Sequence, residues 1–75
     1  MFLGPDIGSH DWSPDGTRIV FDLRSTNELW IADLLTVQVY LLYGGSAYRA
    51  VWSPDGTKIA FQEPKFLGDI LTIKP

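Results

Sequence analysis

Hydrophobic and polar positions alternate along most of the chain in short stretches. The clearest examples are 18–22 and 58–62, where a buried centre is flanked by positions that alternate between apolar and polar. Residues 28–33 and 36–43 add further stretches, and the second of these is rich in β-branched and aromatic side chains. No segment keeps a helical period. The pattern therefore predicts an all-β protein.

The chain repeats itself at an offset of 40 residues. The string Trp-Ser-Pro-Asp-Gly-Thr occupies residues 12–17 and again 52–57, and the apolar positions that follow each copy also match. In Ser-Pro-Asp-Gly, proline presets φ for a type I turn and the following glycine adopts a positive φ. Each copy is therefore predicted to hold a hairpin at this point.

The repeat resembles that of TolB-type β-propellers, which also occurs in the propeller domains of prolyl-oligopeptidase-like enzymes. The residues that carry the resemblance are the Trp-Ser-Pro-Asp-Gly-Thr strings, the Ile-x-Phe positions after them, and Leu-Trp-Ile-Ala-Asp at 29–33. The resemblance implies blades of four antiparallel strands around a central channel. It covers nearly the whole chain, and it is much less specific for function than for blade structure.

Two blades follow from this resemblance. The first is expected at about 8–43, with strands at 8–13, 17–23, 28–33 and 36–43. The second is expected at about 48–75, with strands at 48–53, 57–63 and 69–74 and no fourth strand. Trp12 and Trp52 share a repeat position and are predicted to pack between blades, whereas Trp30 is predicted to lie in a core.

A replacement for the missing strand stands at the start of the chain, because 1–4 is in phase with the end of the first blade's fourth strand at 41–44. Two blades cannot close a ring and would expose apolar faces and strand edges. We therefore expect a homo-oligomeric propeller in which 1–4 completes the last blade of a neighbouring chain. The expected interface residues are Met1, Phe2, Leu3, Trp12, Trp52, Ile70 and Ile73.

A homotrimer with six blades is favoured, because TolB-type repeats commonly form six-bladed rings, and a homotetramer with eight blades is the next choice. The alternative is a piece of a longer propeller, serving as an accessory or gating module of a hydrolase or of a TolB-like periplasmic protein.

Composition narrows the chemistry. The 75 residues include no Cys and one His, which excludes disulfides, thiolate metal sites and a cysteine nucleophile. The net charge is −3 and the six Lys and Arg are scattered, so neither nucleic acid nor a membrane is an expected partner. The first six residues have no signal-peptide pattern, which favours the cytoplasm, while the resemblance would allow the periplasm. The compartment stays open.

Candidate catalytic and metal-binding residues are few. Ser9, His10 and Asp11 are adjacent, and neighbouring side chains on a strand point to opposite faces, so they are not expected to form a catalytic triad. Asp15 and Asp55 are explained by the turns rather than by a calcium loop. A ring of His10 side chains on a symmetry axis is the one metal arrangement left, and a hydrogen-bonded or solvated histidine is the simpler interpretation. We therefore expect no enzyme activity, no metal and no cofactor.

A ligand is expected at the mouth of the channel, where the resemblance places the loops between fourth and first strands and between second and third strands. The candidate residues are His10, Arg24, Tyr48 and Arg49, the last two because Tyr and Arg dominate binding hot spots. A peptide, a protein or a small polar molecule would fit such a site, and ordinary exposed loops are the alternative.

Overall fold

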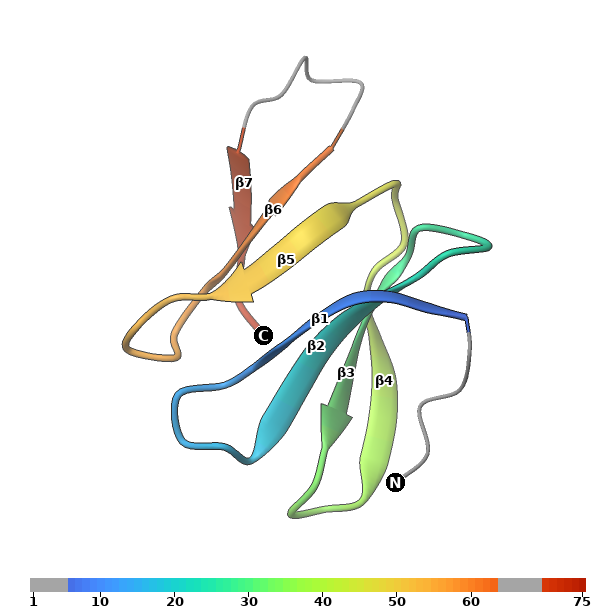
Figure 1. Ribbon diagram of the computed structural model, residues 1–75. Coiled ribbons are helices and arrows are strands. Elements are labelled where there is room, and N and C mark those ends of the chain that lie inside the picture. The colour runs from blue at the N-terminus through green and yellow to red at the C-terminus, as the bar shows by residue number, and fades with distance from the viewer. Residues whose placement is uncertain (1–5, 64–69) are drawn as a thin grey trace.

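The computed structural model describes residues 6–63 and 70–75, and these form two antiparallel sheets (Figure 1). The first sheet has the order β1-β2-β3-β4 and the second the order β5-β6-β7. The strands are β1 (Ile7–Trp12), β2 (Arg18–Leu23), β3 (Leu29–Asp33), β4 (Gln38–Tyr43), β5 (Tyr48–Trp52), β6 (Ile59–Gln62) and β7 (Ile70–Ile73). The predicted all-β class is confirmed, and each of these strands begins and ends within two residues of its predicted limits.

No helix in the described residues is long and apolar enough to cross a membrane. Met1, Phe2 and Leu3, which we expected to join a neighbouring chain, lie outside the described residues, and so does the side chain of Ile70.

The two Asp-Gly turns have the predicted hairpin geometry. Asp15 Oδ1 accepts hydrogen bonds from Ser13 Oγ (2.7 Å), Thr17 N (3.0 Å) and Thr17 Oγ1 (2.8 Å), and Gly16 has φ 75°. Asp55 makes the same three bonds in the second copy, where Gly56 also has φ 75°. A positive φ is available to glycine without a steric cost, so the sequence of each turn dictates its shape.

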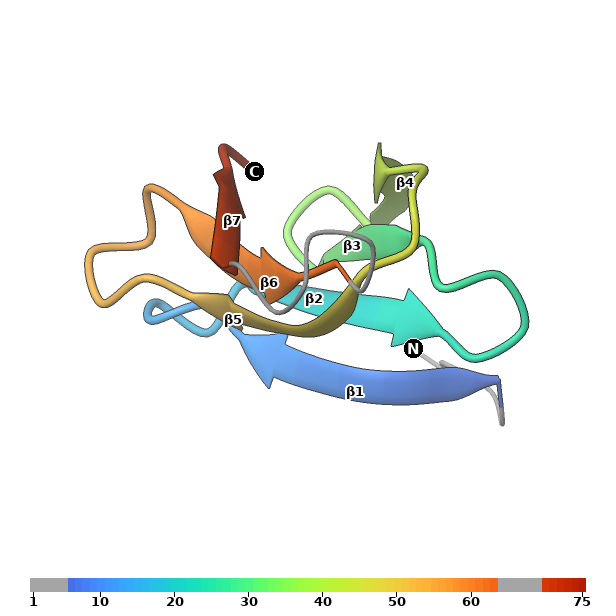
Figure 2. The same cartoon turned by 90° about the horizontal axis from the view of Figure 1, so that it is seen from above.

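The sheets pack through their first strands, because β5 contacts β1 and β2. Figure 2 shows β1 and β5 side by side. The last strand of each sheet, β4 or β7, forms the edge farthest from this contact. The core between the sheets combines Val20, Leu29 and Ile31 from the first sheet with buried residues of the second sheet, which are Ala50, Trp52, Ile59 and Phe61. Leu71 and Ile73 of β7 pack against this core from the second sheet.

A second apolar cluster lies on the opposite face of the first sheet. Its buried members are Ile19, Phe21 and Ala32, with Trp30, Ile7 and Leu23 packed against them. Because strand residues alternate between faces, this cluster cannot contact the second sheet. We call this surface the free face.

The carboxylates of the two turns make the free energy of unfolding depend on pH. Hydrogen bonds from Ser13 and Thr17 lower the pKa of Asp15 to about 2, and those from Ser53 and Thr57 lower the pKa of Asp55 to about 2. A carboxyl group whose pKa is lowered by folding stabilises the folded state above its unfolded pKa of about 4, and loses that contribution as the pH falls toward 2.

We therefore predict that a double variant, Asp15→Asn with Asp55→Asn, loses less stability than the wild type between about pH 4 and pH 2. Thermal unfolding followed by circular dichroism across this range measures the difference. Equal losses in the two proteins would contradict the role assigned to these carboxylates.

Candidate functional site

Asp11 and Trp52 join the two sheets. Asp11 Oδ2 accepts a hydrogen bond from Trp52 N (2.8 Å), and the carbonyl oxygen of Asp11 accepts one from Trp52 Nε1 (3.1 Å). The Arg18 guanidinium carbon lies 4.8 Å from the centre of the Trp52 ring, which adds a cation–π contact. Trp52 is thereby 7% exposed and satisfied at both of its N–H groups.

The prediction that Trp52 packs between two blades agrees with its place between the two sheets of this chain. Ile73 packs against the same core. The expected contacts of Trp52 and Ile73 with another chain stay predictions. The other repeat copy, Trp12, pairs with Ile19 in register and is 50% exposed on the free face.

Ser9, His10 and Asp11 do not converge, as the alternation of a strand predicts. Ser9 donates hydrogen bonds from its N and Oγ to Asp22, and Asp11 binds Trp52. His10 pairs with Phe21 in register, so it lies on the free face. Among the described residues, no group of three or more His, Asp or Glu is placed to hold a metal ion.

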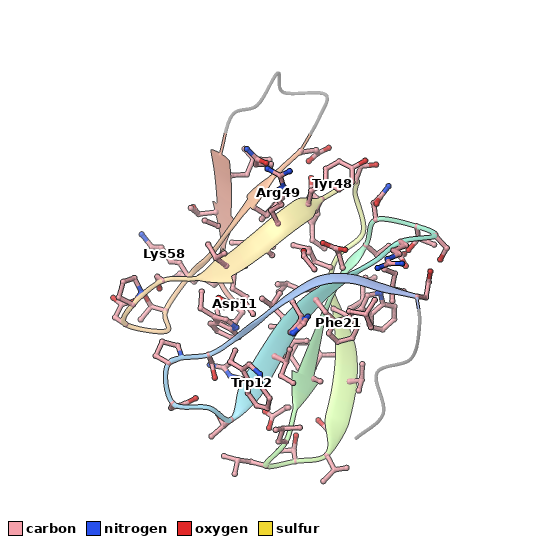
Figure 3. All side chains as sticks on the ribbon, in the orientation of Figure 1. Asp11, Trp12, Phe21, Tyr48, Arg49 and Lys58 are labelled. Atoms are coloured by element: carbon pink, nitrogen blue, oxygen red, sulfur yellow. The ribbon has the colours of Figure 1, made fainter. Side chains whose placement is uncertain are left out.

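A cavity of about 550 Å³ opens where the ends of β2 and β6 meet the beginnings of β1 and β5. Arg24, Tyr48 and Arg49, three of the four predicted ligand residues, line it together. His10 is not among its lining residues, because its register with Phe21 turns it to the free face. In Figure 3, Tyr48 and Arg49 project from one end of β5, and Asp11 lies near the other end.

The wall of this cavity on the first sheet depends on a close backbone approach. A Cβ at Gly8 would lie 2.1 Å from Asp22 Oδ1, so any side chain there would displace the carboxylate that binds Ser9. The register of β1 shifts between Ile7 and His10, and that of β5 shifts between Tyr48 and Val51. Both strands are therefore bulged where they line the cavity, a feature that alternation in the sequence did not reveal.

Another connection between the sheets lies near the ends of β4 and β6, where the Tyr43 hydroxyl donates a hydrogen bond to Glu63. This bond raises the pKa of Tyr43, because the neutral phenol is the donor. The Tyr43 ring also lies 4.8 Å from that of Phe61, measured between centroids.

Comparison with solved structures identifies the architecture. The chain is similar to the β-propeller domain of the Trilobed protease from Pyrococcus furiosus, which is described as having an open velcro topology, with a TM-score of 0.62 and 24% sequence identity. The match covers 75% of this chain and 19% of that one, so the chain spans about a fifth of its neighbour's length. No protein-family model matches the chain, and no curated protein sequence matches it. The similarity shows a propeller-like fold, and we call the two sheets the first and second blade from here on.

The contact between Asp11 and Trp52 predicts a specific loss of stability. Asp11→Ala removes the acceptor of the buried Trp52 N–H and should lower the free energy of unfolding by about 1–3 kcal/mol. Asp11→Asn keeps an acceptor oxygen and should cost less. Urea unfolding followed by tryptophan fluorescence compares the three proteins, and an alanine variant as stable as the wild type would contradict the assignment.

Proposed function

We propose that the chain is a non-enzymatic β-propeller building block that assembles with copies of itself. The free face of the first blade docks on the outer surface of the second blade of another copy. The observation that carries this proposal is that the free face presents the same repeat positions that are buried between the two blades within the chain.

The free face of the first blade matches the buried face of the second blade residue by residue. In the second blade, Trp52 pairs with Ile59, and both are buried against the first blade. In the first blade, Trp12 pairs with Ile19 in the same register at an offset of 40, and no described part of the second blade covers it. A surface built like one half of an existing interface is suited to the same kind of partner.

The free face is apolar and exposed at its margin. Trp12 and Val39 are each 50% exposed and Leu41 is 47% exposed, around the buried residues of the second cluster. Trp30 Nε1 on this face is buried and has no hydrogen-bond partner in the described part of the chain. A docked chain that supplies an acceptor would remove the cost of an unsatisfied donor.

The receiving surface is the outer face of the second blade, where Val51 pairs with Ala60 and Ala60 with Thr72. Val51 stands at the repeat position of Asp11, so in the proposed assembly its carbonyl oxygen would accept a hydrogen bond from Trp12 Nε1 of another copy. Lys58 stands at the repeat position of Arg18 and would lie over the Trp12 ring. A hollow of about 170 Å³ lies at this surface, lined by Arg49, Val51, Ala60, Phe61 and Gln62.

The proposed ring has six blades from three copies, with eight blades from four copies as the next choice, and its blades are of the TolB type. In the described residues β7 is the last strand of the second blade, whereas the first blade continues from β3 to β4. We infer that Met1, Phe2 and Leu3 of a neighbouring copy complete the second blade at this edge, since an unpaired strand edge favours strand addition.

The alternative assigns the two blades to a longer propeller that accompanies a hydrolase. Its support is that the structural neighbour is the propeller domain of a protease. In that case other blades of the same longer chain would cover the free face, and isolated chains would not complement one another in defined pairs.

Complementary variants test the proposal. Trp12→Gln spoils the free face and leaves the receiving surface intact, whereas Val51→Asp does the reverse. Each variant alone should therefore have the 8.4 kDa mass of a single chain, and an equimolar mixture should give a species of twice that mass and no larger ring. Analytical ultracentrifugation measures all three samples.

Leu35→Gln is the matched control, because Leu35 is 77% exposed in the turn after β3 and lies outside both surfaces. It should assemble like the wild type. The proposal fails if the Trp12 and Val51 variants keep the mass of the wild type, or if mixing them produces no paired species.

A further inference from the structure

The cavity between the blades is lined by two cationic side chains, Arg24 and Arg49. Within the described residues, no ion pair joins either guanidinium to a carboxylate. Asp22 is the acidic residue in the lining; it is 6% exposed, and its two oxygens accept from Ser9. The lining thus has two positive charges against one negative charge, in a chain whose net charge is −3.

Comparison of the two repeat copies shows how this excess of positive charge arises. Ser9 and Asp22 in the first blade correspond to Arg49 and Gln62 in the second, at the same offset of 40. The first blade closes this position with a hydrogen bond between its own side chains. The second blade has a guanidinium opposite a neutral amide, so the carboxylate that would neutralise Arg49 is absent from its repeat position.

The backbone of Arg49 is held in an uncommon conformation. Its φ is 54°, inside the bulge of β5, and a positive φ is unfavourable for a residue with a long side chain. Glycine would adopt this conformation at lower cost. Stability alone therefore does not account for arginine at this position.

We propose that this cavity binds a carboxylate, held between the Arg24 and Arg49 guanidinium groups with the rest of the ligand against the Tyr48 ring. A guanidinium donates paired hydrogen bonds in the geometry that a carboxylate accepts. The volume of about 550 Å³ lies in the range of small-molecule sites. The ligand is a small organic acid or the carboxyl end of a peptide, which share this chemistry. All of these lining residues come from one chain, so the site does not depend on self-assembly.

Isothermal titration with matched probes tests the site. Succinate is compared with its neutral diamide, and a short peptide with a free carboxyl end is compared with the same peptide amidated. We expect the charged member of at least one pair to bind, with an affinity that falls as salt is added. Binding of succinate indicates a small organic acid as the natural ligand, whereas binding of the free peptide alone indicates a peptide end.

Variants separate the site from general charge effects. Arg24→Gln and Arg49→Gly should each weaken binding of the charged probe that the wild type binds, succinate or the free peptide, by about ten-fold or more. Arg49→Gly should melt no lower than the wild type, because it removes the strained φ. Lys74→Gln, which removes one positive charge outside the cavity, should bind like the wild type.

The same titration in the Trp12→Gln variant distinguishes this inference from the proposed function, since the cavity should bind its ligand even in a single chain. The inference is overturned if neither charged probe binds, if the neutral probes bind equally well, or if the two arginine variants retain full affinity.

Discussion

The contact between Trp52 and Asp11 is the interaction on which the arrangement of the two blades depends. It satisfies both N–H groups of a buried tryptophan with one residue of β1, and Arg18 covers the indole ring. With β5 held against β1 in this way, Val20, Leu29 and Ile31 form one core with residues of the second blade. The cavity lined by Arg24 and Arg49 opens beside this core, where β1 and β5 are bulged.

The same contact is the basis of the proposed assembly. Its repeat position recurs in the first blade as Trp12, which has Ile19 beside it as Trp52 has Ile59. One tryptophan is buried at 7% exposure and the other stands at 50%, although their local sequences are identical for six residues. In the described residues, a second blade packs against Trp52 and none packs against Trp12. In the proposed assembly, a blade of another copy covers Trp12 as the first blade covers Trp52.

The strands, the two turns and the burial of Trp52 could be predicted from the sequence, because each rests on local patterns that recur in both copies. Asp11 could not be identified as the partner of Trp52, since the second copy has Val51 at that position and no pattern marks the residue. The register of His10 with Phe21, which turns its side chain to the free face and away from the cavity, also depends on pairing between strands. The bulges that bring Ser9 and Arg49 to the cavity depend on tertiary pairing, which alternation does not encode. Positions that the two copies share thus specify the strands and turns of a blade. Positions where the copies differ, such as Ser9 and Arg49, determine which polar and charged groups line the cavity.

Exchange of the indole N–H groups with solvent deuterium, followed by nuclear magnetic resonance, tests the central claim most directly. Trp52 Nε1 is hydrogen bonded within the chain and should exchange slowly at every protein concentration. If the interface recurs between copies, Trp12 Nε1 should also be protected at high concentration, and its protection should disappear on dilution or in the Val51→Asp variant. A Trp12 indole that exchanges as fast as free tryptophan at high protein concentration, while that of Trp52 stays protected, would contradict the account.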